Sequence, residues 1–255
     1  MKIGITGCTG RVGALLVEEL LSGRWEGLEL AGGTVRDISK SNDNFFITDN
    51  AEELFKRSDA IIDFTTPEAS RTHIQLASEH KTPMVLATTG FTADDEKAIT
   101  KASTQAPIVY AANTSIAVTM LNALVEKAAA SLGPDFDIEI VEAHHKHKVD
   151  APSGTAIMLG KTAAQSRNQT FDDVAVMSRE GHTGPRKDGE IGLSTIRGGD
   201  VVGEHSVYFI GDGERLELKQ QATNRALYAK GALHAIRWAA KQPPGLYSMG
   251  DVLGL

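Results

Sequence analysis

The chain has 255 residues and a net charge of −7, with 26 lysines and arginines against 33 aspartates and glutamates. Its 41% hydrophobic and 23% charged residues argue against a disordered chain, and its acidic balance argues against nucleic-acid binding. The single cysteine, Cys8, excludes a disulfide scaffold and a multi-cysteine metal site. Because it lacks both a signal-peptide pattern and an apolar run of about 20 residues, we expect a soluble, cytoplasmic protein with no membrane partner.

The first 115 residues alternate short apolar runs with segments of helical periodicity. The apolar runs predict buried strands at residues 2–6, 28–35, 60–64, 83–87 and 107–111. Helices are expected between them at residues 12–21, from 67 to about 79, and at 92–103 with Thr92 as the cap. Apolar strands that alternate with helices are typical of a parallel sheet covered on both faces.

The pattern changes after Ser115. A long helix is expected at 115–132, a strand at 137–143 and a second helix at 153–165. Further strands are predicted at 174–179, 191–197, 204–210 and 215–222, with a Gly-Asp-Gly hairpin turn before the last. A final helix covers 225–240, and residues 242–245 look like a linker. We therefore expect an α/β chain with a Rossmann-like doubly wound parallel sheet and a second α+β domain with a mixed open sheet.

A glycine-rich loop, residues 7–13, joins the first predicted strand to the first helix. Its spacing leaves room for a nucleotide pyrophosphate against backbone N–H groups: Gly7 makes the turn, Gly10 permits close approach, and Gly13 lets helix and strand pack. Arg11 could also reach a phosphate. The spacing is GxxGxxG rather than GxGxxG, so turn glycines without a ligand remain an alternative.

The end of the second predicted strand bears on the cofactor. An acidic residue there favours NAD, and a cation accommodates the extra phosphate of NADP. Val35 cannot bond a ribose, whereas Arg36 can pair with a phosphate and Asp37 could accept from ribose hydroxyls. NADPH is therefore favoured, and NADH remains open. The alternative is that Arg36 and Asp37 only face water.

A run of five basic or potentially basic residues, 144–148, leads into a predicted helix start at Ser153. Like charges repel, so the run is best explained by a bound anion. Ser153, Gly154 and Thr155 would present N–H groups and hydroxyls to a carboxylate. The cluster thus predicts a site for a small, multiply anionic substrate with a histidine or lysine as proton donor.

Two other interpretations of the cluster stay open. His145 and His147 share a face if the strand continues, and Glu142 or Asp150 could add an oxygen ligand to form a zinc site. The spacing is not the one that zinc sites usually have, so we expect no metal. A solvated basic loop is the second alternative.

The segment 144–156, HHKHKVDAPSGTA, resembles the signature of the 4-hydroxy-tetrahydrodipicolinate reductase family. The glycine loop, ATTGF at 87–91, AANTS at 111–115 and RGGDVVGEH at 197–205 resemble other blocks of that family in the same order. The resemblance covers nearly the whole chain.

The resemblance implies NADPH- or NADH-dependent reduction of 4-hydroxy-tetrahydrodipicolinate to tetrahydrodipicolinate with loss of water, in the diaminopimelate route of lysine biosynthesis. The substrate is a small cyclic dicarboxylate, and the implied assembly is a homotetramer. The implied NAD(P)-binding domain is discontinuous, 1–115 with 224–255. Residues 116–223 would bind substrate and form the subunit contacts.

The resemblance also implies roles for individual residues. His144 matches the acid/base position and Lys148 the proton donor. The positions that match contacts to the substrate carboxylates are His145, Ser153, Gly154 and Thr155. The positions that match cofactor contacts are Gly7, Cys8, Thr9, Gly10, Arg11, Val12, Val35, Arg36, Ala87, Thr88, Thr89, Ala111, Ala112, Asn113 and Thr114.

Three residues differ from the family's usual pattern: Val35 replaces an acidic ribose contact, Ala87 replaces a glycine, and Thr114 replaces a bulkier side chain. These differences bear on the cofactor rather than on the reaction. Another NAD(P)-dependent imine or amino-acid dehydrogenase, or a non-catalytic NADPH-binding regulator, is the alternative function.

Overall fold

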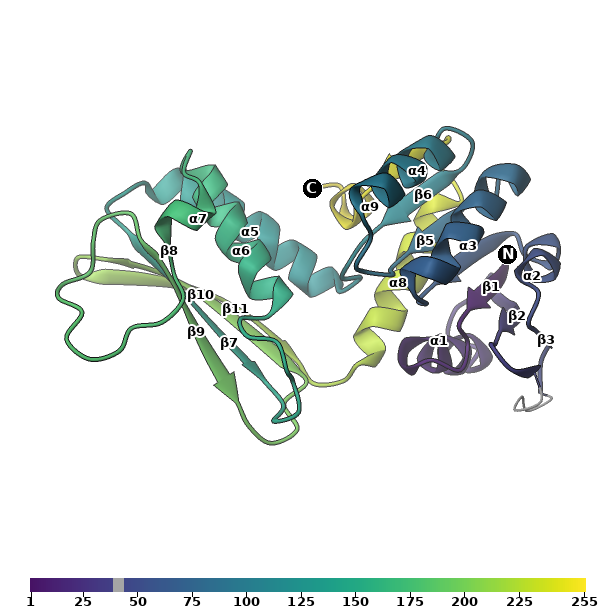
Figure 1. Ribbon diagram of the computed structural model, residues 1–255, viewed down its shortest axis with the longest axis horizontal. Coiled ribbons are helices and arrows are strands. Elements are labelled where there is room, and N and C mark those ends of the chain that lie inside the picture. Colours follow the sequence, from purple (N-terminus) through teal and green to yellow (C-terminus); the bar gives the residue numbers. More distant parts are fainter. Residues whose placement is uncertain (39–43) are drawn as a thin grey trace. The chain divides into compact units, whose positions relative to one another are not determined.

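The computed structural model describes residues 1–38 and 44–255, and it contains two compact units (Figure 1). One unit consists of Met1–Ile116 and Arg225–Leu255, and the other of Ala117–Asn224. The chain therefore leaves the first unit once and returns to it. Among the described residues, none of the helices combines the length and the hydropathy that crossing a bilayer requires.

The first unit is built on a seven-stranded sheet in which every pair of neighbours is parallel. Its order is β12-β6-β5-β4-β1-β2-β3. The strands are β1 (Lys2–Thr6), β2 (Glu29–Thr34), β3 (Ile47–Thr48), β4 (Ala60–Asp63), β5 (Met84–Leu86), β6 (Pro107–Tyr110) and β12 (Gly245–Tyr247). The predicted parallel sheet is confirmed.

Helices cover both faces of this sheet. Successive residues of a strand point to opposite faces, so neighbouring residues pack against different helices. Ile62 and Val85 pack with α1 (Arg11–Leu21), α8 (Ala226–Ala239) and α9 (Met249–Leu253). Their neighbours Ile61 and Met84 pack with α2 (Ala51–Arg57), α3 (Pro67–His80) and α4 (Ala93–Ser103). The unit is thus doubly wound, as predicted.

The strand order reverses beside β1. The chain runs from β1 to β2 and β3 on one side, and then places β4 on the other side of β1. The carboxyl ends of β1 and β4 therefore lie next to each other where the connections diverge. In open parallel sheets, this is where ligands bind.

The second unit is built on a five-stranded sheet of order β11-β10-β7-β9-β8. β7 pairs parallel with β9 and antiparallel with β10, so the sheet is mixed, as predicted. Figure 1 shows its helices on one face of the sheet. The elements are α5 (Ile116–Leu132), β7 (Asp137–His144), α6 (Gly154–Ser166), α7 (Phe171–Val174), β8 (Ala175–Val176), β9 (Ile191–Arg197), β10 (Gly203–Gly211) and β11 (Glu214–Ala222).

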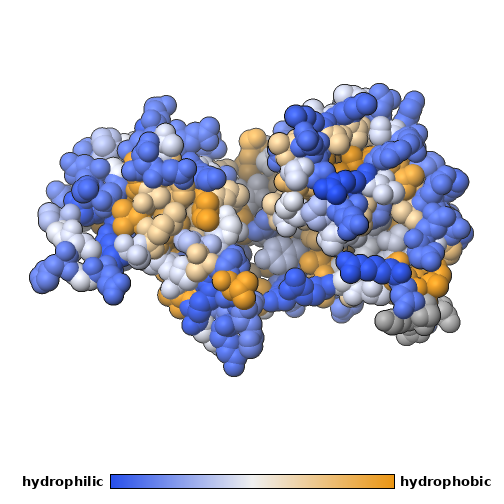
Figure 2. Space-filling view, viewed as in Figure 1, coloured by the Kyte–Doolittle hydropathy of each residue, from blue (hydrophilic) through white to orange (hydrophobic). Residues whose placement is uncertain are grey.

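The core of the second unit lies between the sheet and these helices. Leu121 and Val125 of α5 and Leu159 of α6 pack on Ile140 and Phe209, and all five are buried. Hydrophilic side chains dominate the face of each unit in Figure 2, with smaller apolar groups among them, as is usual for globular proteins.

Most predicted elements are found within one residue of their expected ends, but the strand predicted at 174–179 is wrong. Val174 belongs to α7, and only Ala175 and Val176 pair with β9. Beyond them the chain leaves the sheet, and Arg179 bonds Glu139 through both guanidinium nitrogens at 2.9 and 3.0 Å. The sequence also did not predict β3, α2, α7, β12 or α9; Gly245, placed in a linker, begins β12 beside β6.

Candidate active site

The glycine loop makes the turn between β1 and α1. Gly7 has a φ of +74°, a conformation that favours glycine. A Cβ on Gly13 would overlap the Gly7 carbonyl, so α1 can approach the loop only with a glycine there. Gly10 is the N-cap of α1 and has no side chain to bond the helix's first N–H groups. The start of α1 is therefore suited to an anion.

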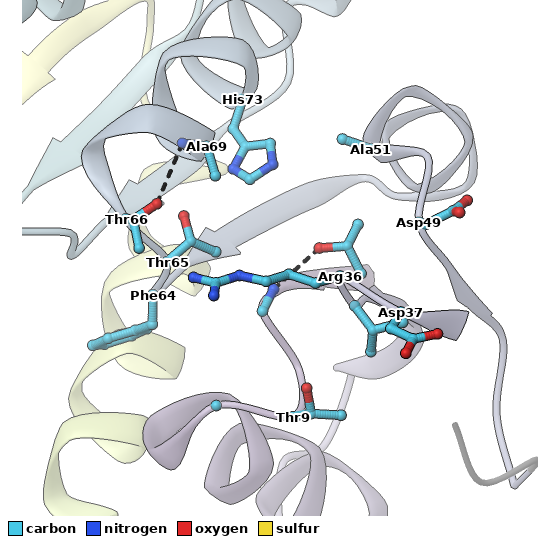
Figure 3. Close-up of a pocket in the computed structure, with 14 residues that line it drawn as sticks. Thr9, Arg36, Asp37, Asp49, Ala51, Phe64, Thr65, Thr66, Ala69 and His73 are labelled. Carbon is cyan, nitrogen blue, oxygen red and sulfur yellow. Dashed lines mark hydrogen bonds between the residues drawn. The ribbon is translucent and has the colours of Figure 1, made fainter. Parts of the chain in front are cut away.

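A cavity of about 760 Å³ opens at the reversal of strand order (Figure 3). The ends of β1, β2 and β4, together with the start of α3, form its walls. The lining residues are Gly7, Thr9, Gly10, Thr34, Val35, Arg36, Asp37, Asp49, Ala51, Phe64, Thr65, Thr66, Ala69 and His73. The structure thus brings five of the predicted cofactor residues, Gly7, Thr9, Gly10, Val35 and Arg36, around one space.

Arg36 extends across this cavity between the glycine loop and the start of α3, whereas Asp37 points to another side (Figure 3). Arg36 also lines an adjoining hollow, together with Thr66 and Arg71. A guanidinium in the cavity favours a ligand that carries a phosphate on this side.

The other predicted cofactor residues lie outside the walls of this cavity. Cys8 is buried against Gly33, and burial raises the pKa of its thiol. Arg11 and Val12 begin α1. The rest follow the ends of β5 and β6: Ala87, Thr88, Thr89, Ala111, Ala112, Asn113 and Thr114.

Two of these strand-end residues are fixed by hydrogen bonds. The Thr88 hydroxyl oxygen accepts from the Thr65 N–H at 3.0 Å and from the Ser70 hydroxyl at 2.9 Å. Thr114 is buried, and its hydroxyl donates to the Tyr228 carbonyl of α8 at 2.8 Å. A Cβ on Gly231 would overlap the Thr114 carbonyl, so α8 packs closely against this loop.

Sequence reasoning did not single out a fully buried acid at the end of β4. Asp63 accepts a hydrogen bond from the Thr65 hydroxyl at 2.6 Å and lies 3.1 Å from Nδ1 of His73. Thr65 and His73 both line the cavity, so the acid lies directly behind its wall. The signal in the sequence was an aspartate at the carboxyl end of an otherwise apolar strand.

A second buried acid, Glu142, organises the substrate residues predicted in the other unit. Nδ1 of His144 lies 2.6 Å from its Oε2 atom, and the Arg197 guanidinium donates to both carboxylate oxygens at 2.8 Å. Burial alone would raise the pKa of Glu142, but hydrogen bonds from Arg197 and His144 lower it to about 2. The carboxylate is therefore ionised at neutral pH.

Lys148 belongs to the same group of side chains. Its ammonium lies 2.8 Å from the Asp150 carboxylate, while Arg197 donates to the Asp150 backbone carbonyl at 2.7 Å. Arg197 was predicted only as part of a motif, and its contact with Glu142 spans 55 positions. The sequence alone gave no sign of this pairing.

Ser153 caps α6 and connects it to the acid. Its hydroxyl oxygen accepts from the Ala156 N–H at 3.2 Å, and its own N–H donates to Glu142 at 3.1 Å. Gly154 and Thr155 form the first turn of α6, and His145 directly follows β7. Within residues 1–38 and 44–255, no three His, Cys, Asp or Glu side chains form a group that could hold a metal ion.

His205, on β10, lies against Ser153 and His144. It is buried, its Nε2 lies 3.0 Å from the Ser153 hydroxyl, and its ring meets that of His144 edge to face at 5.2 Å. Burial, with the nearby His144 as a second cause, lowers the pKa of His205 to about 4. The imidazole is therefore neutral in the folded protein at pH 7.

This lowered pKa predicts a pH dependence of stability. Between pH 6.5 and about 4 the unfolded chain protonates His205 and the folded chain does not, so acid favours unfolding. The shift corresponds to about 3 kcal/mol of unfolding free energy lost across that window. Urea unfolding at several pH values measures it: His205→Asn should lose about 3 kcal/mol less than wild type. His182→Asn, at an exposed position of the same unit, should retain the wild-type slope; equal slopes for all three would contradict the assignment.

Two models of one family match consecutive parts of the chain in the expected order. Residues 1–114 match the model described as dihydrodipicolinate reductase, N-terminus, and residues 117–253 match the one described as dihydrodipicolinate reductase, C-terminus. The chain belongs to the dihydrodipicolinate reductase family. The resemblance inferred from the sequence motifs is confirmed.

Individual members of the dihydrodipicolinate reductase family match the chain over its full length. Proteins named 4-hydroxy-tetrahydrodipicolinate reductase from Zymomonas mobilis and Sulfurovum sp. are 45% and 46% identical to it. Each match covers 100% of this chain, and 98% and 99% of the relative. A solved dipicolinate-bound dihydrodipicolinate reductase from Paenisporosarcina sp. TG-14 shares the fold, with a TM-score of 0.80, 23% identity and 97% of each chain covered.

Proposed function

We infer that the chain reduces 4-hydroxy-tetrahydrodipicolinate to tetrahydrodipicolinate with loss of water, using NADPH or NADH, in the diaminopimelate route to lysine. The observation that carries this inference is the grouping of His144 and the start of α6 around the buried Glu142 carboxylate, with Lys148 joined to the group through Asp150 and Arg197. It combines proton-transfer groups with a helix start that can bind a carboxylate. The full-length similarity to proteins named for this reaction supports it.

The proposed chemistry divides between the two units. Loss of the 4-hydroxyl group as water, with a proton from the adjacent ring carbon, leaves a carbon–carbon double bond. A bound reduced nicotinamide would supply a hydride to the unsaturated carbon that carried the hydroxyl group. This carbon is conjugated to an imine, so the reduced ring is an electron-rich enamine whose adjacent carbon must take up a proton. Lys148 is the proposed donor and His144 the acid/base group beside it. His145, Ser153, Gly154 and Thr155 would bind the substrate carboxylates through N–H groups, hydroxyl groups and an imidazole.

The first unit fits a dinucleotide, since a Cβ on Gly13 would overlap the loop and the start of α1 is left uncapped. The loop from Gly7 to Val12 would hold the pyrophosphate, with Val35 and Arg36 beside the adenosine ribose. The strand-end residues Ala87–Thr89 and Ala111–Thr114 would line the nicotinamide. Since Val35 offers no acceptor and Arg36 crosses the cavity, NADPH should bind more tightly than NADH.

Arg36→Ala tests this cofactor preference. Loss of charge-assisted bonds to the 2′-phosphate, worth about 1.5–3 kcal/mol, should raise the Kd for NADPH about 10- to 150-fold. The Kd for NADH should change little, and fluorescence titration measures both. Arg24→Ala, an exposed arginine beyond the end of α1, serves as the control. An equal effect on both cofactors would contradict the assignment.

We also propose the domain roles, assembly and location. Residues 1–115 with 224–255 bind the cofactor, and residues 116–223 bind the substrate and form the subunit contacts of a homotetramer. The sheet face opposite α5 and α6 exposes Ile196 and Ile210 by 54% and 39%, which supports burial of this face against another copy. Sedimentation velocity should find a tetramer that Ile196→Lys weakens.

A cytoplasmic location agrees with one buried, unpaired cysteine.

A coupled assay tests the reaction. Substrate is made in place from pyruvate and aspartate semialdehyde by the synthase, and the loss of reduced-nicotinamide absorbance is followed with NADPH and NADH side by side. Oxidation that depends on the synthase is expected. If folded protein binds NADPH without oxidising it, another imine substrate or a regulatory role replaces the proposal.

A further inference from the structure

Glu142 is bonded more fully than a structural role for a carboxylate requires. It is 1% exposed and has five donors close to its two oxygens. Oε2 faces His144 Nδ1 and one Arg197 nitrogen, at 2.6 and 2.8 Å. Oε1 accepts from the other Arg197 nitrogen, the Ser153 N–H and the Thr195 hydroxyl, at 2.8, 3.1 and 3.3 Å. Every acceptor position of the carboxylate is in use.

The fold itself has little need of this charge. The start of α6 is already capped by the Ser153 hydroxyl. A buried ion pair is rarely required for stability, since apolar groups of the same volume often serve as well. The placement of Glu142 is better explained by the groups around it: it contacts His144 directly, and Arg197 and Asp150 connect it to Lys148.

The contact with Glu142 decides which nitrogen of His144 carries a proton. An ionised carboxylate can only accept, so the proton of neutral His144 lies on Nδ1 and its Nε2 has a free lone pair. A Cβ on residue 203 would lie 3.0 Å from Nε2, and glycine at that position keeps the space beside this atom free of a side chain. The ring of His205 packs on the ring of His144 and fixes its plane.

Arg197 extends the control of Glu142 to Lys148. The guanidinium nitrogen Nη2 that bonds Oε1 of Glu142 also donates to the Asp150 carbonyl at 2.7 Å. Asp150 in turn holds the Lys148 ammonium at 2.8 Å. One carboxylate thus contacts the acid/base group directly and the proton donor through Arg197.

We propose that Glu142 is the positioning residue of this site: it fixes the proton of His144 on Nδ1 and, through Arg197, holds the turn that carries Lys148. The inference rests on the proposed function for its catalytic meaning. The position of the proton, however, is a property of the protein without substrate and is measurable on its own.

Glu142→Gln tests this proposal directly, because a side-chain amide accepts hydrogen bonds only at its oxygen, whereas the carboxylate accepts at both oxygens. Arg197 donates to both oxygens, so an NH2 group opposes a donor in either orientation. Oε1 has three donors and Oε2 has two, so the amide oxygen should take the Oε1 position. The NH2 group then faces His144 Nδ1, which must accept, and the proton moves to Nε2.

We expect two results from Glu142→Gln. In ¹⁵N spectra of protein labelled at histidine, the His144 signals, assigned by their loss in His144→Asn, should change from the Nδ1-protonated to the Nε2-protonated form. The kcat should fall about 10²–10⁴-fold, since the proton then lies on the wrong nitrogen, while KM for NADPH stays the same. An unchanged protonation pattern or an unchanged kcat would overturn the proposal.

Glu139→Gln is the matched control. Glu139 lies on the same strand and also binds an arginine through both oxygens, Arg179 at 2.9 and 3.0 Å, but outside the site. It should leave both the His144 spectrum and kcat unchanged. If the wild type does not turn over the substrate but Glu142→Gln moves the proton, the proposed function fails and the positioning role stands.

Arg197→Lys decides the matter if Glu142→Gln does not fold, as judged by circular dichroism and NADPH binding. Lysine retains the charge but cannot bond both Glu142 and the Asp150 carbonyl as the guanidinium does. His144 should keep its proton on Nδ1 while kcat falls more than about tenfold through loss of the Lys148 position. A wild-type kcat in this variant would overturn the proposal.

Discussion

Lys148→Met should lower kcat by about 10²–10⁴-fold, the range expected when a positioned proton donor is removed. Methionine retains much of the unbranched side chain but has no proton to give. The affinity for NADPH should stay at the wild-type value, because the glycine loop and Arg36 belong to the other unit. Steady-state rates in the coupled assay and fluorescence titration of NADPH measure the two quantities separately.

The control for Lys148→Met is Lys161→Met, which makes the same change at an exposed position of α6. It should retain the wild-type kcat. A Lys148→Met variant that turns over as fast as this control would remove Lys148 from the mechanism. Parallel losses of turnover and NADPH affinity would instead indicate damage to the fold.

The Lys148 ammonium forms an ion pair with Asp150, and this pair orients the proposed proton donor. The Asp150 carboxylate lies 2.8 Å from the Lys148 ammonium, and Lys148 lowers the pKa of this carboxylate. Asp150 is 56% exposed, and exposed ion pairs contribute little stability. The pair therefore serves mainly to orient Lys148, and Asp150→Asn should reduce kcat far less than Lys148→Met.

The sequence predicted the parts of this protein that are encoded locally. The first strand, glycine loop and first helix form one continuous pattern of buried residues, turn residues and helical periodicity. The same holds for the start of α6, which was predicted at Ser153 and is observed with Ser153 as its N-cap. Such features depend on residues within a few positions of one another.

Contacts between distant residues could not be read from the sequence. Glu142 was considered only as a metal ligand, because its pairing with Arg197 arises from the register of β7 with β9. β12 was missed because it has three residues and gains its pairing from β6, far away in the chain. Burial of Asp63 follows from the packing of α3, which no local pattern expresses.

His73→Ala should lower the free energy of unfolding by about 1–3 kcal/mol. Asp63 is fully buried, and Nδ1 of the His73 side chain, which is 8% exposed, lies 3.1 Å from its carboxyl group. Leaving a buried polar group without its hydrogen-bond partner costs about 1–3 kcal/mol. Urea unfolding measures the loss.

His80→Ala, at an exposed position in the last turn of the same helix, should cost less than about 0.5 kcal/mol. Adding Asp63→Asn to His73→Ala should recover part of the loss, because the remaining partners, the Thr65 and Thr88 hydroxyls, can satisfy a neutral amide. A double variant less stable than His73→Ala would contradict this hydrogen-bond argument.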